Sequence, residues 1–292
     1  MAVDVDLYGD FVEQVRTNFN MDAAIDQLEV VRRYAWFDLR RLPPKKWKVH
    51  FSKELQQNQF LIDYREYIDR IRDKAESGED LTPHASTRVD NIQGKDELLA
   101  DWGIYHLHPG HGTRPARSGF VNRAGELLFV FPNADNLYFL DVLDHSSWTN
   151  FSLIEVIDKN WPSAIDHCRL KDVIELSFEP TENELYNLRK NQINASFRVG
   201  SSFFSCPGGG LATDGAANRA VSMSLNVRKI LNDYSEQLRE EESDLRKMFA
   251  EKAGTALTVD PVCFKLLKYD PKKGTGEIVE TNSGIEWTFS FS

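Results

Sequence analysis

The chain has 292 residues and a formal net charge of −10, with 45 Asp and Glu residues against 35 Lys and Arg residues. Hydrophobic residues make up 41% of the chain, which is enough for a packed core and excludes a disordered or low-complexity protein. No run of about 18 apolar residues occurs, so the sequence predicts no membrane-spanning helix and no membrane partner.

The compartment is predicted from the N-terminal residues and from the cysteines. The stretch MAVDVDLYGD contains acids where a secretory signal has a basic segment and an apolar run. Cys168, Cys206 and Cys263 lie far apart and in no CxxC spacing, which argues against a disulfide framework. We therefore expect a cytoplasmic protein.

Helical periodicity dominates the N-terminal part of the chain. Apolar residues recur at three- and four-residue steps over residues 1–42 and again over residues 52–77, and Pro43 ends the first of these patterns. Between the two patterns, residues 46–52 alternate as one short strand does. The polar stretch that follows, residues 77–96, contains Gly and Pro and predicts a domain boundary.

The remainder of the chain mixes strands and helices. Its predicted elements are, in order, strands over 102–108, 126–132 and 136–142, a helix from Thr149 to 161, a helix over 181–194, a strand over 196–205, a helix over 216–253 and three strands over 261–292. The sequence thus predicts an α+β protein with a helical N-terminal region, residues 1–95, and a core domain, residues 96–292. We expect the core domain to hold a mixed or antiparallel sheet, then a long helix and a C-terminal β-meander.

Histidine and arginine gather in one part of the predicted core domain. The segment HLHPGH contributes His106, His108 and His111, and the turn after the hairpin contributes His145. On a strand, side chains two residues apart point to the same face, so His106 and His108 can address one pocket. Residues 102–125 also contain three arginines and no acid, which is unusual in an acidic chain. Such a cluster is typical of a metal site or of acid–base catalysis.

One interpretation of the cluster is a zinc site. The spacing H-x-H-x-x-H is similar to the ligand motif of metallo-β-lactamases, with Gly110 where that family carries an Asp. The chain would then be a zinc-dependent hydrolase with His106, His108, His111 and His145 as metal ligands.

The other interpretation is ribonuclease chemistry without a metal or a cofactor. Cleaving RNA with its own 2′-hydroxyl requires a base, an acid and a cation for the phosphorane charge, and imidazole with arginine supplies all three. The predicted catalytic residues are His106, His108, Arg123 and His145. We expect His108 to act as base or acid with His106 or His145 as its complement, and Arg123, aided by Arg117, to stabilise the phosphorane.

Substrate binding is predicted for cationic, aromatic and glycine residues. Positive charge beside aromatic rings suits the binding of phosphate and the stacking of a base. The glycines of CPGGGLATDG precede the long helix, where backbone amides can approach an anion. Residues 185–213 also lack acids, so this stretch and residues 102–125 could meet around one site. The predicted substrate-binding residues are Arg114, Arg117, Tyr105, Tyr138, Gly208, Gly209 and Gly210.

The motifs DWGIYHLHPG, GELLFVF, YFLDVLDHSSW and IEVIDKNWP carry a resemblance over residues 75–165. The chain resembles a family of uncharacterised bacterial and prophage-associated proteins, which often have a second adjacent His where this chain has Tyr105. Its hairpin core with strand-borne His and Arg is similar in style to the RelE and barnase-like endoribonucleases. The resemblance implies a toxin or phage-defence effector that cleaves RNA and has a cognate inhibitor or defence-system protein as partner.

A non-catalytic function is the alternative from another class. In that case residues 216–253 dock on a partner protein or form a homo-oligomer, and the acidic surface has a regulatory role.

Overall fold

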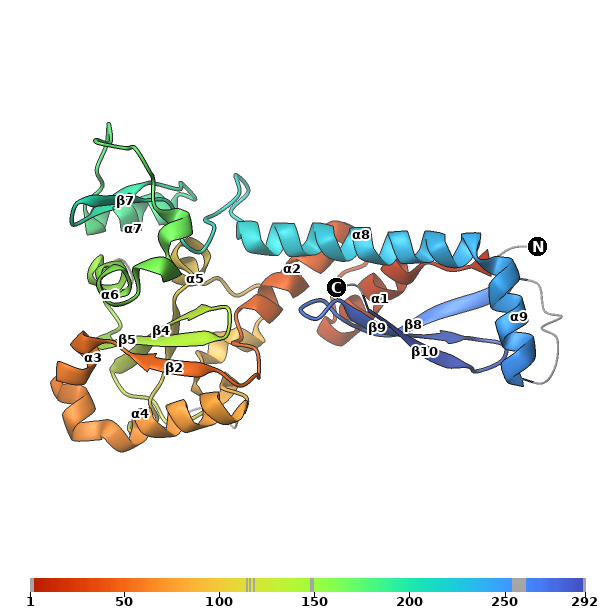
Figure 1. The fold of residues 1–292 in the computed structure, drawn as a ribbon, viewed down its shortest axis with the longest axis horizontal. Coiled ribbons are helices and arrows are strands. Elements are labelled where there is room, and N and C mark those ends of the chain that lie inside the picture. Colours follow the sequence, from red (N-terminus) through yellow and green to blue (C-terminus); the bar gives the residue numbers. More distant parts are fainter. Residues whose placement is uncertain are drawn as a thin grey trace. The chain divides into compact units, whose positions relative to one another are not determined.

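The computed structural model describes residues 3–113, 115, 117, 119–147, 150–253 and 261–290, and only the backbone of residues 249, 250, 252 and 253. The chain forms two compact units, unit 1 (residues 1–35 and 220–292) and unit 2 (residues 36–219) (Figure 1). It passes between them within α2 (Gln27–Leu39) and at the start of α8 (Asn218–Glu240). Helices and mixed sheets occur together, which confirms the predicted α+β class.

Unit 1 is built on a four-stranded sheet in the order β1-β8-β9-β10. Strand β1 runs parallel to β8, and the other neighbours are antiparallel. The strands are β1 (Val3–Asp4), β8 (Val262–Asp270), β9 (Thr275–Glu280) and β10 (Glu286–Ser290), and the helices besides α2 and α8 are α1 (Leu7–Phe19) and α9 (Glu242–Ala253). The predicted C-terminal β-meander is therefore confirmed.

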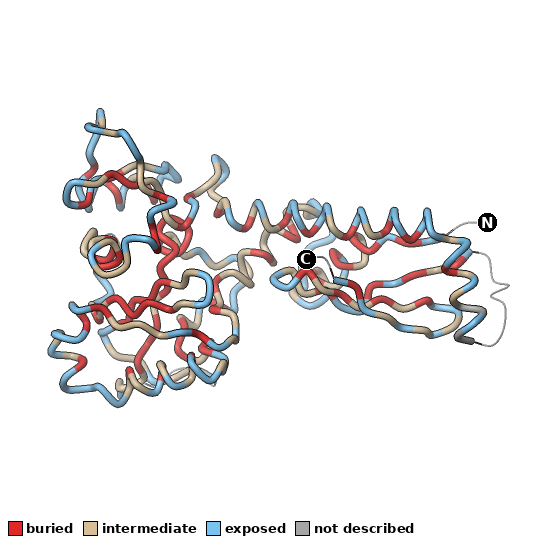
Figure 2. Tube along the Cα trace, viewed as in Figure 1, coloured by how far each residue is buried: buried red, intermediate tan, exposed pale blue. Residues whose placement is uncertain are grey.

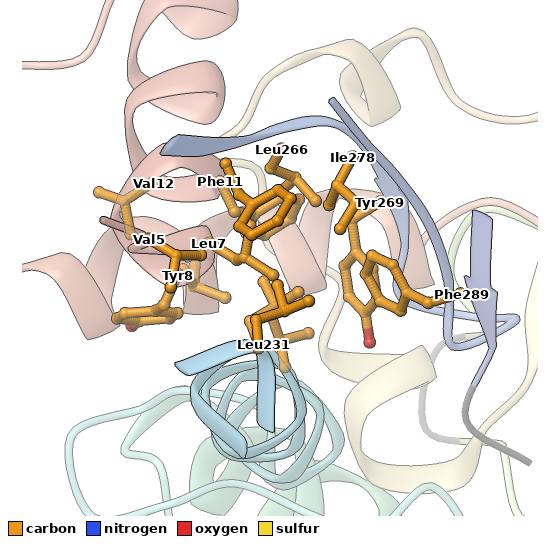
Figure 3. Close-up of a cluster of buried hydrophobic side chains, with 14 of the residues drawn as sticks. Val5, Leu7, Tyr8, Phe11, Val12, Leu231, Leu266, Tyr269, Ile278 and Phe289 are labelled. Atoms are coloured by element: carbon orange, nitrogen blue, oxygen red, sulfur yellow. The ribbon is translucent and has the colours of Figure 1, made fainter. Parts of the chain in front are cut away.

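The core of unit 1 lies between this sheet and helices α1 and α8 (Figure 3). Phe11 of α1, Leu231 of α8 and Ile278 of β9 are buried in one cluster, whose apolar area removed from water stabilises the unit. Helix α1 begins after Asp6, whose carboxylate accepts the amide proton of Gly9 at 2.8 Å. That bond satisfies one amide that no preceding turn can satisfy.

The predicted long helix divides into α8 and α9 at Glu241. The apolar face of α8 is buried within unit 1 through residues such as Val227, Leu231 and Leu238. A homo-oligomer formed through α8 would therefore have to use its outer, charged face. Within the described ranges, no helix combines the length and the apolar character needed to cross a membrane.

Unit 2 is built on a second four-stranded sheet, in the order β2-β5-β4-β3. Strand β2 is parallel to β5, whereas β5–β4 and β4–β3 are antiparallel. The strands are β2 (Lys48–Phe51), β3 (Tyr105–Leu107), β4 (Glu126–Asn133) and β5 (Asn136–Asp144), and a separate hairpin consists of β6 (Phe197–Val199) and β7 (Ser202–Phe204). The predicted strand over 196–205 is this hairpin, which turns at Gly200 with a φ of +59°.

Helices cover both faces of the unit 2 sheet (Figure 1). Successive residues of β4 alternate between two cores, with Phe129 packed on the side of α6 and Val130 packed on the side of α4. This explains why β4 is buried along most of its length (Figure 2). The helices are α3 (Lys53–Gln57), α4 (Gln59–Ser77), α5 (Glu97–Trp102), α6 (Ser152–Asn160) and α7 (Glu182–Lys190), with single 3₁₀ turns η1 (Thr82–His84), η2 (Thr87–Asp90), η3 (Pro162–Ala164) and η4 (Asp166–Cys168).

The division into units differs from the expected boundary at residue 95. Strand β2 lies before that position but pairs in parallel with β5, so the N-terminal region supplies an edge of the unit 2 sheet. Residues 1–35 fold instead with residues 220–292, because α1 shares a core with β8, β9 and β10. The polar stretch of residues 77–96 is no linker, since it forms η1 and η2 within unit 2. The predicted helix start at Thr149 lies outside the described residues.

Candidate functional site

A cleft of about 750 Å³ opens in unit 2 among β3, η2, α5 and α7, and we name it the His/Arg cleft. It brings together the four side chains predicted to be catalytic, namely His106, His108, Arg123 and His145. Its volume lies within the range of about 300–1,000 Å³ that is typical of ligand pockets. The charged or ring-bearing side chains that line it are Arg40, Arg88, Lys95, Asp96, Glu97, His106, His108, Arg123, His145, Tyr186 and Arg189.

Strand β3 aims two imidazoles into the cleft. His106 is paired with Phe129 of β4, and His108 follows the strand two residues later, so the alternation predicted from the sequence holds. The Nδ1 atom of His106 lies 3.8 Å from the Oδ2 atom of Asp96, the residue whose carboxylate also caps α5. Asp96 thus faces one imidazole of the cleft with negative charge.

The main chain on both sides of His108 is held by His84. The amide of His108 donates to the carbonyl oxygen of His84 at 2.7 Å, and Nδ1 of His84 donates to the carbonyl oxygen of His108 at 2.8 Å. The neighbouring Pro83 carbonyl accepts the amide proton of Val121 at 3.0 Å. The turn η1 therefore fastens the loop that carries His108 at two points.

Burial lowers the pKa of His108 and of His106. Burial and the positive charge of Arg123 lower the pKa of His108 to about 3, with smaller contributions from His106, His145 and His84. Burial also lowers the pKa of His106, an effect that Asp96 opposes. His108 is only 6% exposed, and its Nδ1 atom has no hydrogen-bond partner among the described residues. A buried polar atom without a partner is a group available to a ligand.

The lowered pKa of His108 predicts a loss of stability in acid. The unfolded chain takes up a proton near pH 6.5, whereas the folded chain does so only near pH 3, so stability is complete above pH 6.5 and falls as the pH falls. Between these two pH values, the titration of His108 is expected to lower the free energy of unfolding by up to about 1.4 kcal/mol per pH unit of acidification. Urea unfolding at several pH values between these limits measures it.

The matched variant for this measurement is His108→Gln, which cannot titrate. We expect its free energy of unfolding to fall less steeply with acidification than that of the unaltered protein. Equal slopes for the two proteins would contradict the assignment of a neutral, buried His108.

Arg123 and His145 complete the predicted catalytic set. His145 is exposed in the turn after β5, and its ring centre lies 5.7 Å from that of His108 in an edge-to-face arrangement. Arg123 lies over Phe120, and its Nη2 atom is buried without a hydrogen-bond partner among the described residues. Gly112 approaches the Arg123 main chain so closely that a Cβ would lie 1.7 Å from its carbonyl oxygen. Glycine is therefore required beside Arg123.

Positive charge prevails in the His/Arg cleft. Among the residues that the structure describes, five basic side chains line it against two carboxylates, those of Asp96 and Glu97. Two of the five are buried: Arg40 donates to the carbonyl oxygen of Arg88 at 2.8 Å, and Arg189 forms an ion pair with Asp101 at 2.5 Å. The local field therefore favours an anion even though the chain as a whole is acidic.

The aromatic residues predicted to bind substrate do not line the cleft. Tyr105 points to the opposite face of the sheet, where its hydroxyl donates to the carbonyl oxygen of Leu39 at 2.6 Å and burial raises its pKa to about 12. Tyr138 packs between His50 and Trp161, with ring centres 5.2 and 4.5 Å away. Both rings are core residues because alternate strand positions face the packed layers.

The predicted arginines of the 110–118 loop also differ from expectation. Arg117 is not among the cleft-lining side chains; it forms an ion pair with Asp90 and lies over Phe120. Arg114 lies outside the described residues. Of the two described arginines in residues 102–125, Arg123 lines the cleft and Arg117 does not.

The glycine turn is a packing contact. The amides of Gly208 and Gly210 donate to the carbonyl oxygens of Asp101 and Ala100, and the amide of Gly209 donates to that of Cys206. Amides already bonded to protein carbonyls cannot hold a phosphate, which corrects the prediction for these three residues. A Cβ on Gly208 would lie 2.4 Å from the amide nitrogen of Gly103, so glycine is needed for this close approach.

His111 lies apart from the other histidines. Its Nε2 atom is 3.1 Å from the Oε2 atom of Glu126, and its ring packs against Phe60, Tyr64 and Tyr67 of α4. The zinc-ligand set of four histidines is thereby separated. Within the part of the chain that the structure describes, no three His, Cys, Asp or Glu side chains are arranged to hold a metal ion.

Several residues in or next to the cleft were not predicted as site residues from the sequence. Arg88, Lys95 and Asp96, which line the cleft, lie in the polar stretch that was predicted to be a boundary. His84, which holds the main chain of His108 from outside the cleft lining, belongs to no motif. Residues 185–213 contribute Tyr186 and Arg189, so the two acid-free stretches do meet at this cleft, as the sequence suggested.

Comparison of the chain with protein-family models, with curated proteins and with solved structures gave no match.

Proposed function

We propose that the His/Arg cleft is the active site of a metal-independent endoribonuclease. The observation that carries this proposal is the convergence of His106, His108, His145 and Arg123 in one cleft where basic side chains outnumber acids. These residue types supply a base, an acid and a fixed cation, which are the groups that RNA cleavage by its 2′-hydroxyl requires.

His108 is assigned as the general base. Its imidazole is neutral, so it can accept the proton of the attacking 2′-hydroxyl. Burial and the Arg123 charge keep the pKa of the empty site at about 3. A bound phosphate would offset the charge of Arg123 and raise that pKa, which brings the base closer to the value that suits proton transfer near neutral pH.

His145 is assigned as the general acid. It is exposed, and its ring centre lies 5.7 Å from that of His108, so the two imidazoles can act on one phosphate. The 2′-oxygen attacks phosphorus while its proton passes to His108. The bond from phosphorus to the 5′-oxygen breaks, and His145 gives that oxygen a proton. Arg123 stabilises the phosphorane charge, and the products are a 2′,3′-cyclic phosphate and a 5′-hydroxyl.

The test is incubation of the purified protein with single-stranded RNA and with DNA of the same sequence, both in EDTA. We expect cleavage of RNA alone, because DNA lacks the nucleophile. Absence of RNA cleavage in EDTA would contradict the proposal, and so would equal cleavage of DNA.

His84 is predicted to act as a positioning residue for this reaction. The substitution His84→Ala removes the Nδ1 donor to the His108 carbonyl. We therefore expect kcat to fall at least tenfold with little change in KM. Asn can place an amide donor near the same point, and His84→Asn is expected to recover most of the activity. Steady-state kinetics of both variants, with melting temperatures as control, check this.

A purely structural role for His84 predicts another pattern. In that case both variants would lose activity only in proportion to the fraction unfolded, and Asn would give no selective recovery of kcat.

A further inference from the structure

Helix α7 presents an exposed aromatic ring to the His/Arg cleft. Tyr186 lines the cleft and is 40% exposed, although its neighbour Leu185 is buried. The helix is fixed beneath this ring, since Arg189 pairs with the buried carboxylate of Asp101 and Thr181 forms a capping box with Glu184. Tyr186 is therefore a flat surface on a rigid support, which is what the stacking of a nucleobase requires.

One cation lies near this ring, and others line the cleft. The Nζ atom of Lys190 lies 5.4 Å from the centre of the Tyr186 ring. Arg88 and Lys95 also line the cleft; both are exposed, and neither forms an ion pair with any described residue. A cleft lined by an exposed ring and by cations without ion pairs can combine base stacking with phosphate binding, the two interactions that hold single-stranded nucleic acids.

The volume of the cleft is sufficient for unpaired RNA and too small for an RNA duplex. A volume of about 750 Å³ is that of a pocket for small molecules, so it can enclose a short run of unpaired nucleotides but not a duplex. In a duplex, moreover, the faces of the bases are covered by their neighbours and cannot stack on a protein ring.

We infer that the His/Arg cleft binds single-stranded RNA, with an unpaired base stacked on Tyr186 and the adjoining phosphates held by Arg88 and Lys95. This inference rests on the proposed function and specifies its substrate class. It assigns the walls of the cleft to substrate binding and leaves the reaction itself to the histidines and Arg123.

The experiment measures binding separately from cleavage. The probe is a short RNA of mixed sequence with 2′-fluoro groups, which cannot be cleaved by 2′-hydroxyl attack, used single-stranded and annealed to its complement. We expect Tyr186→Ala to weaken binding of the single strand roughly tenfold or more, and Tyr186→Phe to bind within about twofold of the unaltered protein. The duplex is expected to bind at least about tenfold more weakly than the single strand.

Tyr64 provides the matched control. It is 41% exposed, as Tyr186 is, but lies on α4 against His111 and outside the cleft lining. Tyr64→Ala is expected to bind the single strand as the unaltered protein does.

The possible results distinguish failure of the single-strand binding proposal from failure of the proposed ribonuclease activity. If the unaltered protein cleaves RNA in EDTA but Tyr186→Ala binds the probe normally, or the duplex binds as tightly as the single strand, the inference fails and the function stands. If the unaltered protein neither binds the probe nor cleaves RNA, both fail.

Discussion

Replacement of His108 by alanine is expected to slow RNA cleavage by about 10²–10⁴-fold, the contribution that a positioned general base makes. The expectation follows from the site, because His108 is the neutral imidazole of the cleft with a buried nitrogen that no described residue satisfies. Its ring also adjoins both His145 and the charge of Arg123, where the reacting phosphate would lie.

The matched control is His167→Ala. His167 is exposed on η4 and does not line the cleft, so its loss is expected to leave the cleavage rate unchanged. His108→Gln accompanies the alanine variant, because the amide keeps most of the side-chain volume at a buried position. Circular dichroism establishes the folded fraction of each variant. Full activity in a folded His108→Gln protein would remove His108 from the mechanism.

The largest effect on stability is expected at the ion pair between Asp101 and Arg189. The two side chains are 5% and 3% exposed, and the guanidinium also lies over the ring of Trp102. Asp101→Ala leaves a buried guanidinium without its carboxylate, which costs about 3–5 kcal/mol. Urea unfolding measures this loss, and the cleft is expected to lose substrate affinity as well, because α7 carries Tyr186.

Two further variants test whether the loss of stability in Asp101→Ala comes from the buried charge of Arg189 that is left without its carboxylate. The exposed pair of Lys229 and Asp233 on α8 is the reference, and Asp233→Ala is expected to change stability by less than about 1 kcal/mol. The double variant Asp101→Leu with Arg189→Met removes both charges, so it is expected to be more stable than Asp101→Ala alone. A single Asp101→Ala variant as stable as Asp233→Ala would show that the buried pair is not needed.

The fold could be predicted from the sequence where the pattern is local. The two apolar runs of residues 126–132 and 136–142, separated by a short polar turn, indicated the hairpin of β4 and β5, and the turns of the C-terminal region indicated the meander. Pairings between distant segments have no such signal. The parallel contact of β2 with β5, and the packing of α1 on the C-terminal strands, depend on complementary surfaces that only the folded chain brings together.

The site, like the fold, could be predicted only where its residues form a local pattern in the sequence. The two-residue spacing of His106 and His108 fixes their common face, and the absence of acids around Arg123 marked a basic segment. The prediction for the glycine turn is wrong because the amides of Gly208 and Gly210 donate to α5, about 100 residues earlier in the chain, and that of Gly209 donates to Cys206. His84 left no pattern at all, since its role is a pair of hydrogen bonds to the main chain of His108.

The net charge of −10 describes the chain as a whole and not the His/Arg cleft. The cleft is nevertheless basic within an acidic protein. The acid-free residues 102–125 and 185–213 contribute Arg123 and Arg189 to it, and Arg40, Arg88 and Lys95 come from other parts of unit 2. Repulsion from the rest of the surface would limit nonspecific RNA binding, so we expect the affinity of the cleft to be sensitive to salt.

The central claim is that this cleft cleaves RNA by attack of the 2′-hydroxyl, with histidine and arginine as the catalytic groups. Analysis of the RNA termini formed in EDTA tests it most directly. We expect 2′,3′-cyclic phosphate and 5′-hydroxyl ends, formed by the unaltered protein and lost in His108→Gln. Products with 3′-hydroxyl and 5′-phosphate ends, or no products unless a divalent metal is added, would contradict it.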